Sequence, residues 1–179
     1  MLKKAIVIGI LSLSNIIHAG EHRIVIHGHA SHLKPTDHYT GIGYNEQNFG
    51  IGYQYTTYED NSDDYFVWST SVNTIKDSYK RDFPFVTAGI AYRFNALPVS
   101  LNLTGMFGVK WLDHHLTDGN TGEWIKTLYS YKSPVGGIMP GATLHLGILD
   151  LNYNFTPRFE FANMYLEGFH YFSASIKFF

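Results

Sequence analysis

The chain has 179 residues, with 13 Tyr, 13 Phe and 3 Trp, no Cys, a formal net charge of −2 and only 16% charged residues. This composition excludes an intrinsically disordered segment, a disulfide-stapled scaffold and a cysteine-ligated zinc module. It also lacks the basic excess of a nucleic-acid-binding protein, and a chain of this length is expected to form one domain.

The N-terminal segment has the pattern of a Sec signal peptide. Two lysines precede the apolar run Ala5–Leu13, which is too short to span a membrane, and Ala19 supplies a small residue for cleavage. We therefore expect residues 1–19 to be a signal peptide and residues 20–179 to be the mature domain. Because an exported chain without cysteine has no disulfides, burial or a closed hydrogen-bond ladder must stabilise it.

The mature chain alternates apolar and polar residues with a period of two, which is typical of β-strands. The clearest case is Val99–Trp111, where mostly large apolar residues at odd positions alternate with mostly small or polar residues at even positions. No segment shows a convincing helical stripe of apolar residues. The pattern predicts eight strands, in chain order 23–33, 49–58, 65–76, 84–94, 98–111, 134–145, 147–155 and 169–179.

We expect these strands to form an all-β fold, an eight-stranded antiparallel transmembrane β-barrel. Their lengths are near the roughly 9–11 residues that a tilted strand needs to cross a bilayer. Their polar positions carry Ser, Thr, Asn and Gly rather than Lys and Glu, and small uncharged side chains suit a narrow lumen. The chain also stops on an aromatic residue, Phe179, as outer-membrane barrels commonly do. A secreted β-sandwich is the alternative fold.

An even strand number puts both termini on the periplasmic side, so the longer connections are expected to face outward. These outer connections are 33–48, 77–83, 112–133 and 156–168, whereas the inner ones at 95–97 and near Gly147 are short. The exception on the inner side is the acidic turn 59–64. We interpret it as a solvated hairpin end rather than a calcium site, which needs more oxygen ligands at defined spacing.

This topology gathers His, Asp and Ser residues at the outer rim. The first predicted strand ends in a run that contains His27, His29 and His32, and the third runs out into Asp77-Ser78. The tops of these strands lie roughly 10 Å apart at about 4.8 Å per step, a gap that loop residues can close. Such residues can supply a proton shuttle, an orienting carboxylate and a hydroxyl nucleophile. The same residues also have explanations that do not involve catalysis. Asp and Ser are common in turns, and His often forms hydrogen bonds at the membrane interface.

Several motifs, in order and spacing, resemble the lipid A palmitoyltransferases of the Gram-negative outer membrane (PagP-type). The motifs are Lys76-Asp77-Ser78 with Pro84 and Gly89, a His shortly before Tyr44-Asn45-Glu46, Pro134–Ala142, and the aromatic pairs Tyr171-Phe172 and Phe178-Phe179. The resemblance covers most of the mature chain. It implies a monomeric outer-membrane enzyme that moves a palmitoyl-like chain from a phospholipid donor to lipid A or lipopolysaccharide as acceptor, without cofactor or metal.

The resemblance also implies catalytic His, Asp and Ser residues at the outward mouth, where Asp77 and Ser78 match directly. The His is open among three candidates. Spacing favours His32, with His29 second and His27 third, but strict alternation places His27 and His29 on one strand face and His32 on the other.

Gly89 matches a family glycine at the floor of the acyl pocket that sets the accepted chain length, and alternation directs it into the lumen. Any narrow barrel needs small lumenal residues, which explains Gly89 equally well. If the first explanation holds, Gly89→Met is expected to shorten the transferred chain.

Two features depart from the family. The mature chain has no room for an amphipathic helix before its first strand, and the segment between the fifth and sixth strands is longer. That segment holds His114-His115, which point to opposite sides of an extended chain and are expected to face solvent rather than bind metal. Lys76, Lys80 and Arg81 supply rim cations for lipid phosphates.

Two other functions are compatible with the sequence. A non-enzymatic barrel, such as a structural protein, adhesin or surface-exclusion factor, needs no special rim residues. A lipid A deacylase would use water as the acceptor. Convergence of a His, Asp77 and Ser78 above an unfilled lumen would favour the acyltransferase, whereas a lumen plugged by Tyr and Arg would favour the structural barrel.

Overall fold

The computed structural model describes residues 20–34, 36–37, 41, 43–57, 65–118, 124–157, 159–161, 164–166 and 168–178. The predicted signal peptide, the acidic turn 59–64 and Phe179 lie outside these residues. In the part of the chain that the structure describes, no helix is long and apolar enough to cross a membrane.

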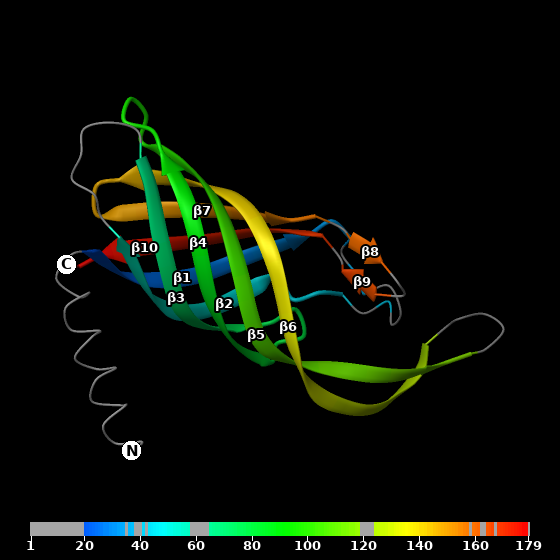
Figure 1. Ribbon diagram of the computed structural model, residues 1–179. Helices are drawn as coiled ribbons and strands as arrows, with labels where there is room; N and C mark the ends of the chain where they lie inside the picture. Colours follow the sequence, from blue (N-terminus) through cyan, green and yellow to red (C-terminus); the bar gives the residue numbers. More distant parts are fainter. Residues whose placement is uncertain are drawn as a thin grey trace, which may run out of the picture.

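The described residues form β-strands joined by turns (Figure 1). Eight strands close into an antiparallel barrel with the neighbour order β1-β10-β7-β6-β5-β4-β3-β2, and β8 and β9 form a separate two-stranded sheet. The predicted eight-stranded antiparallel barrel is therefore confirmed. The strands are β1 (Gly20–His32), β2 (Gln47–Thr57), β3 (Tyr65–Lys76), β4 (Asp82–Arg93), β5 (Val99–Thr117), β6 (Trp124–Leu146), β7 (Leu149–Thr156), β8 (Phe159–Phe161), β9 (Met164–Leu166) and β10 (Phe169–Lys177).

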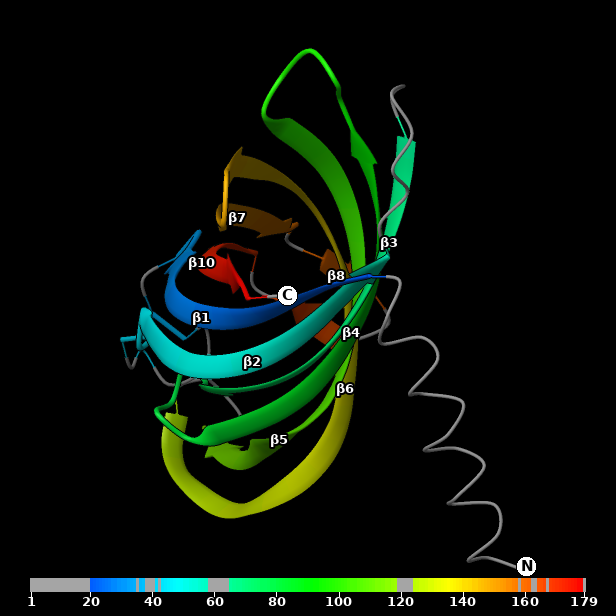
Figure 2. The same cartoon turned by 90° about the vertical axis from the view of Figure 1, so that its left-hand side faces the viewer.

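The first and last strands close the barrel. β1 pairs with β10 from Arg23 opposite Lys177 to His32 opposite Phe169. The start of β1 and the end of β10 consequently lie at the same end of the barrel, as Figure 2 shows by looking from that end. The long connections after β1 and after β7 lie at the opposite end, which we call the mouth.

Side-chain direction follows the alternation seen in the sequence. Large apolar residues cover the outer wall, and polar residues line the lumen. This is the reverse of a soluble domain and is the arrangement of a barrel surrounded by lipid. Exposed wall residues include Ile24, Ile26, Phe49, Ile51, Phe66, Trp68, Leu101, Leu103 and Phe107.

The largest difference from the predicted elements is the hairpin of β5 and β6. Pairing between β4 and β5 ends at Gly108, yet β5 and β6 pair onward from Val109 opposite Pro134 to Thr117 opposite Trp124. We call this extension (109–118 and 124–134) the arm, and it projects beyond the other strands at the mouth (Figure 1). The prediction of a loop at 112–133 is thus wrong. An extension with solvent on both faces has no buried face and so no alternation to reveal it.

The sequence also gave no indication of β8 and β9, which are short strands within the predicted loop 156–168. Beside them, β7 is much shorter than β6 and pairs with it only from Gly141 to Leu146.

Candidate functional site at the mouth

A histidine and a serine meet at the mouth. His32 ends β1, and Ser78 lies in the turn between β3 and β4. The Nε2 atom of His32 is 2.9 Å from the Ser78 hydroxyl oxygen. The Tyr44 ring stacks on the imidazole with 4.2 Å between ring centroids, which fixes its plane.

A β-bulge at Gly28 accounts for the direction of His32. The β1–β10 register shifts between His27 and His29, so one extra residue stands in β1 against consecutive residues of β10. A bulge reverses the alternation beyond it. His27 points into the lumen, His29 is exposed, and Ala30 is again buried, so His32 shares the inward side with His27.

The side chain of Asp77 does not bind His32. Its Oδ1 atom accepts hydrogen bonds from the backbone amides of Tyr79 and Arg81, both at 2.9 Å. Its Oδ2 atom is buried and has no hydrogen-bond partner among the described residues. Asp77, only 4% exposed, therefore organises the β3–β4 turn that carries Ser78.

The triplet Tyr44-Asn45-Glu46 connects the two elements that carry the His–Ser pair. The Asn45 amide donates to the Ser78 carbonyl (2.7 Å), and its side chain donates to the Asp77 carbonyl (3.1 Å). The Glu46 carbonyl accepts from the Ala30 amide (2.9 Å) beside His32. The sequence marks this triplet only as a motif and does not reveal that it joins both halves of the site; its position directly before β2 was the available signal.

The turn beside Ser78 contains a polar network. The Tyr79 hydroxyl donates to Asp37 at 2.6 Å, and burial together with this carboxylate raises the pKa of Tyr79 above its ordinary value. The Asp113 carboxylate on the arm accepts a hydrogen bond from the Arg81 guanidinium at 2.9 Å, and this contact raises the pKa of the guanidinium.

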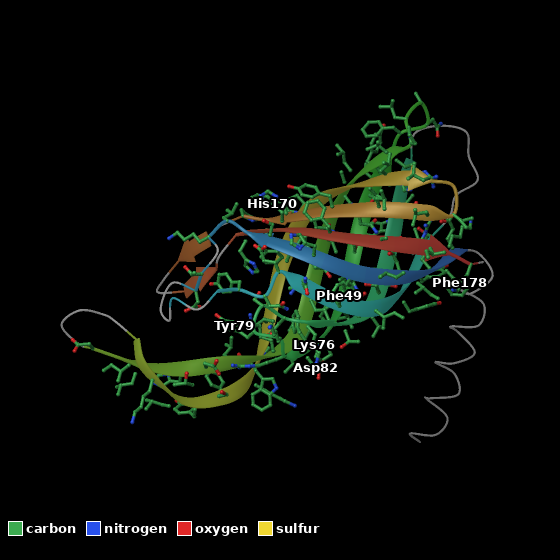
Figure 3. All side chains as sticks on the ribbon, turned by 180° about the vertical axis from the view of Figure 1, so that it is seen from behind. Phe49, Lys76, Tyr79, Asp82, His170 and Phe178 are labelled. Carbon is green, nitrogen blue, oxygen red and sulfur yellow. The ribbon has the colours of Figure 1, made fainter. Side chains whose placement is uncertain are left out.

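The three predicted rim cations differ in their surroundings. Arg81 is engaged by Asp113, Lys76 forms an exposed ion pair with Asp82 (2.7 Å), and Lys80 is exposed. Figure 3 places Lys76, Tyr79 and Asp82 near the base of the arm, with Phe178 at the other end of the barrel.

A hydrogen-bonded chain crosses the lumen below the mouth. His27 Nε2 donates to Asn73 Oδ1 (2.9 Å), and the Tyr171 hydroxyl donates to His27 Nδ1 (2.6 Å). Asn73 in turn donates to Ser71, which bonds Thr87 at 2.6 Å. These side chains link β10, β1, β3 and β4 through the barrel interior.

Ion pairs fill the opposite end of the lumen. Arg23 lies 2.6 Å from Glu21 and 2.7 Å from Asp150, and Lys177 lies 2.7 Å from Glu21. His145 bridges Asp150 (2.9 Å) and Ser100 (3.1 Å). Arg23, Glu21 and Asp150 are buried, so their charges are compensated by one another rather than by solvent.

A cavity of about 140 Å³ remains among these lumenal side chains. Gly89 lies beside it: a Cβ atom there would stand 3.1 Å from the Thr104 hydroxyl and 3.4 Å from the Ser69 hydroxyl. The wall around Gly89 is therefore polar. Among the described residues, no group of His, Asp and Glu side chains is arranged to hold a metal ion.

Fold and site together define a small transmembrane β-barrel with a polar, internally bridged lumen and a His–Ser pair at its mouth. Protein-family models give no match to the chain, and curated proteins give none either. Among solved structures the barrel is similar to Neisserial surface protein A (NspA), at 16% identity and a TM-score of 0.35, covering 89% of this chain and 96% of that one. These comparisons provide no evidence for membership of the lipid A palmitoyltransferase family.

Proposed function

We propose that this protein is a small outer-membrane barrel that acts as a non-enzymatic surface protein, presenting its mouth and arm outside the cell. The observation that carries the proposal is the filled lumen. The chain through Tyr171 and His27 and the ion pairs around Arg23 occupy the space that an acyl chain would need.

The size and polarity of the remaining cavity support this proposal. Pockets for drug-sized ligands typically measure about 300–1,000 Å³ and are mostly apolar. The cavity here is about 140 Å³, and Arg23, Asp150 and Asn102 are among its lining residues. Inserting a hydrocarbon chain would strip these groups of their hydrogen-bond partners, which is costly.

The test is expression in a Gram-negative host that lacks lipid A acyltransferase activity. We expect heat-modifiable, outer-membrane-inserted protein and lipid A of unchanged mass. An acyl chain added to lipid A by wild-type protein, and absent with Ser78→Ala, would contradict the non-enzymatic proposal.

A second candidate function, acyl transfer from a phospholipid to lipid A, is favoured by the contact between His32 and Ser78. An imidazole 2.9 Å from a hydroxyl can accept its proton as the oxygen attacks an ester carbonyl.

The same lipid A measurement tests this candidate, with two further variants. His32→Phe keeps an aromatic ring against Tyr44 but removes the base, and is expected to abolish transfer. His29→Phe alters an exposed histidine on the same strand and is expected to leave transfer intact. In this candidate Asp77 holds the turn, and Gly89→Met tests whether acyl length depends on the lumen.

A further inference from the structure

The arm carries exposed aromatic rings in a row on one face. Leu112 pairs with Tyr131, and His114 pairs with Tyr129, so all four side chains project to the same side of the ladder. The His114 and Tyr129 rings stack with 5.0 Å between centroids, and Tyr129 lies 6.1 Å from Tyr131. Tyr129 is 56% exposed and Tyr131 45% exposed. Both rings therefore offer free surface to a partner.

This row leads back to the mouth. Lys110 lies on the same face of β5, two residues before Leu112, and its ammonium lies 5.9 Å from the centre of the Tyr79 ring. Tyr79 meets Tyr44 edge-on at 6.0 Å, and Tyr44 stacks on His32. We call this series of rings the aromatic track; it comprises His114, Tyr129, Tyr131, Tyr79, Tyr44 and His32.

The chemistry of the track selects the kind of partner. Each Tyr presents an apolar ring face with a polar hydroxyl at its edge. A pyranose ring has the matching surface, with a C–H face that packs on an aromatic ring and hydroxyls around its rim. A lipid tail would instead strip the tyrosine hydroxyls of their hydrogen bonds, at a cost for each.

Charge along the arm favours an anionic saccharide. Lys126 pairs with Leu116 on the track side of the arm and is exposed, and Lys110 lies at the base. Of the arm's acidic residues, Asp113 is neutralised by Arg81, Asp118 lies at the tip, and Glu123 is outside the described residues. The exposed ammonium group of Lys126 can pair with a phosphate or carboxylate substituent.

We propose that the aromatic track binds an anionic saccharide chain, the phosphorylated core oligosaccharide of lipopolysaccharide in the surrounding outer leaflet. This inference rests on the proposed function, because it requires that the mouth and the arm lie outside the cell. The arm supplies the stacking faces, and Lys126 supplies the exposed charge.

The test is a titration of the purified barrel, in a detergent free of lipopolysaccharide, with delipidated phosphorylated core oligosaccharide, followed by NMR saturation transfer and calorimetry. We expect binding that weakens with added salt and with dephosphorylation of the saccharide. The double change Tyr129→Ala and Tyr131→Ala should weaken binding by about tenfold or more, as for other truncated aromatic contacts. Phe at both positions should retain most of the affinity.

The matched control is Tyr53→Ala, which removes an exposed tyrosine from the outer wall and should leave binding unchanged. Equal affinity of wild-type and the double alanine variant, or affinity for neutral dextran equal to that for the phosphorylated saccharide, would overturn the proposal.

A separate measurement distinguishes failure of the track from failure of the proposed function. The chain has no cysteine, so Ser130→Cys places one thiol on the arm. Labelling of this thiol by an impermeant maleimide on intact cells shows that the arm is outside. Labelling without saccharide binding would reject only the proposal that the aromatic track binds saccharide. Absence of labelling in an inserted barrel would also reject the proposal that the protein acts at the cell surface.

Discussion

The side chains at the mouth act mainly through hydrogen bonds that hold the β3–β4 turn in place. Asp77 looks in sequence like a catalytic carboxylate, but its Oδ1 atom bonds two amides of the turn that presents Ser78. Tyr79 looks like an ordinary turn residue, but its hydroxyl is bonded to Asp37. Each assignment leads to a measurable expectation.

Asp77→Ala should loosen the β3–β4 turn, since it removes the acceptor of two backbone hydrogen bonds, each worth about 1 kcal/mol. Asp77→Asn keeps an oxygen at the Oδ1 position and should stay close to wild type. Hydrogen exchange at the Tyr79 and Arg81 amides measures the effect directly. Equal loosening by Asn and Ala would mean that the charge of Asp77, rather than its hydrogen bonds, holds the turn.

Tyr79 makes stability at the mouth sensitive to alkaline pH. Its pKa is raised in the folded protein by burial and by Asp37, so the folded state holds the phenol proton more tightly than the unfolded state. This contribution is complete below the ordinary tyrosine pKa of about 10 and is lost as pH rises above it. We expect the free energy of unfolding to fall less between pH 9 and pH 11 for Tyr79→Phe than for wild type, as measured by urea titration. A fall of the same size in both proteins would count against this role.

At the level of elements, the bulge in β1 determines which histidine reaches Ser78. Strict alternation applied to the sequence put His32 on the strand face opposite His27, and one extra residue at Gly28 reverses that result. The bulge adds one residue to β1 after His27 and leaves the inward direction of His27 unchanged. Changing the number of residues in this part of β1 therefore has a predictable effect on the direction of His32.

Deleting Gly28 should produce a regular β1 that keeps both His27 and His32 pointing inward. Inserting one glycine between Ala30 and Ser31 leaves the bulge as it is and adds one step to the alternation beyond it, so it should instead turn His32 toward lipid. The two cases can be separated in the His32→Cys/Ser78→Cys protein, which has no other thiols, with a short bifunctional thiol crosslinker. We expect efficient crosslinking in the parent and the deletion, and little in the insertion. Efficient crosslinking in all three proteins would show that the direction of residue 32 does not depend on the number of residues that precede it in β1.

The sequence was informative where one strand face contacts lipid and the other contacts the lumen. The range 65–76 matches β3, and the other wall strands differ mainly at their ends. Prediction failed where that contrast disappears: the arm has solvent on both sides, and β8 and β9 span too few residues to show a period. The proximity of His32 and Ser78 followed from topology, but the roles of Asp77 and Asn45 depend on backbone hydrogen bonds that residue spacing does not encode.

At the level of the whole molecule, the lumen joins strands that are distant in the chain. Arg23 from β1 pairs with Asp150 from β7, and Glu21 from β1 pairs with Lys177 from β10. These contacts cross the closing seam and stabilise the cylinder from inside.

Arg23→Met should destabilise the barrel strongly, because it leaves Glu21 and Asp150 as buried charges without their shared partner. Removing one member of a buried pair typically costs about 3–5 kcal/mol. Lys76→Met is the matched control, since Lys76 and Asp82 form an exposed pair worth at most about 1 kcal/mol. Urea unfolding in lipid vesicles, followed by tryptophan fluorescence, gives both values. Similar losses in the two variants would show that the lumenal cluster contributes no more than the exposed pair.

The pairing of β1 with β10 also sets the order of events in biogenesis. The strand that must receive β1 is the last barrel strand in chain order, so the cylinder cannot close before the other barrel strands have been synthesised. Contacts between such distant segments make folding slow and leave strand edges open to wrong pairing until the end. The barrel therefore closes only once β10 is available, and a chain truncated before Phe169 would leave β1 and β7 unpaired at the seam.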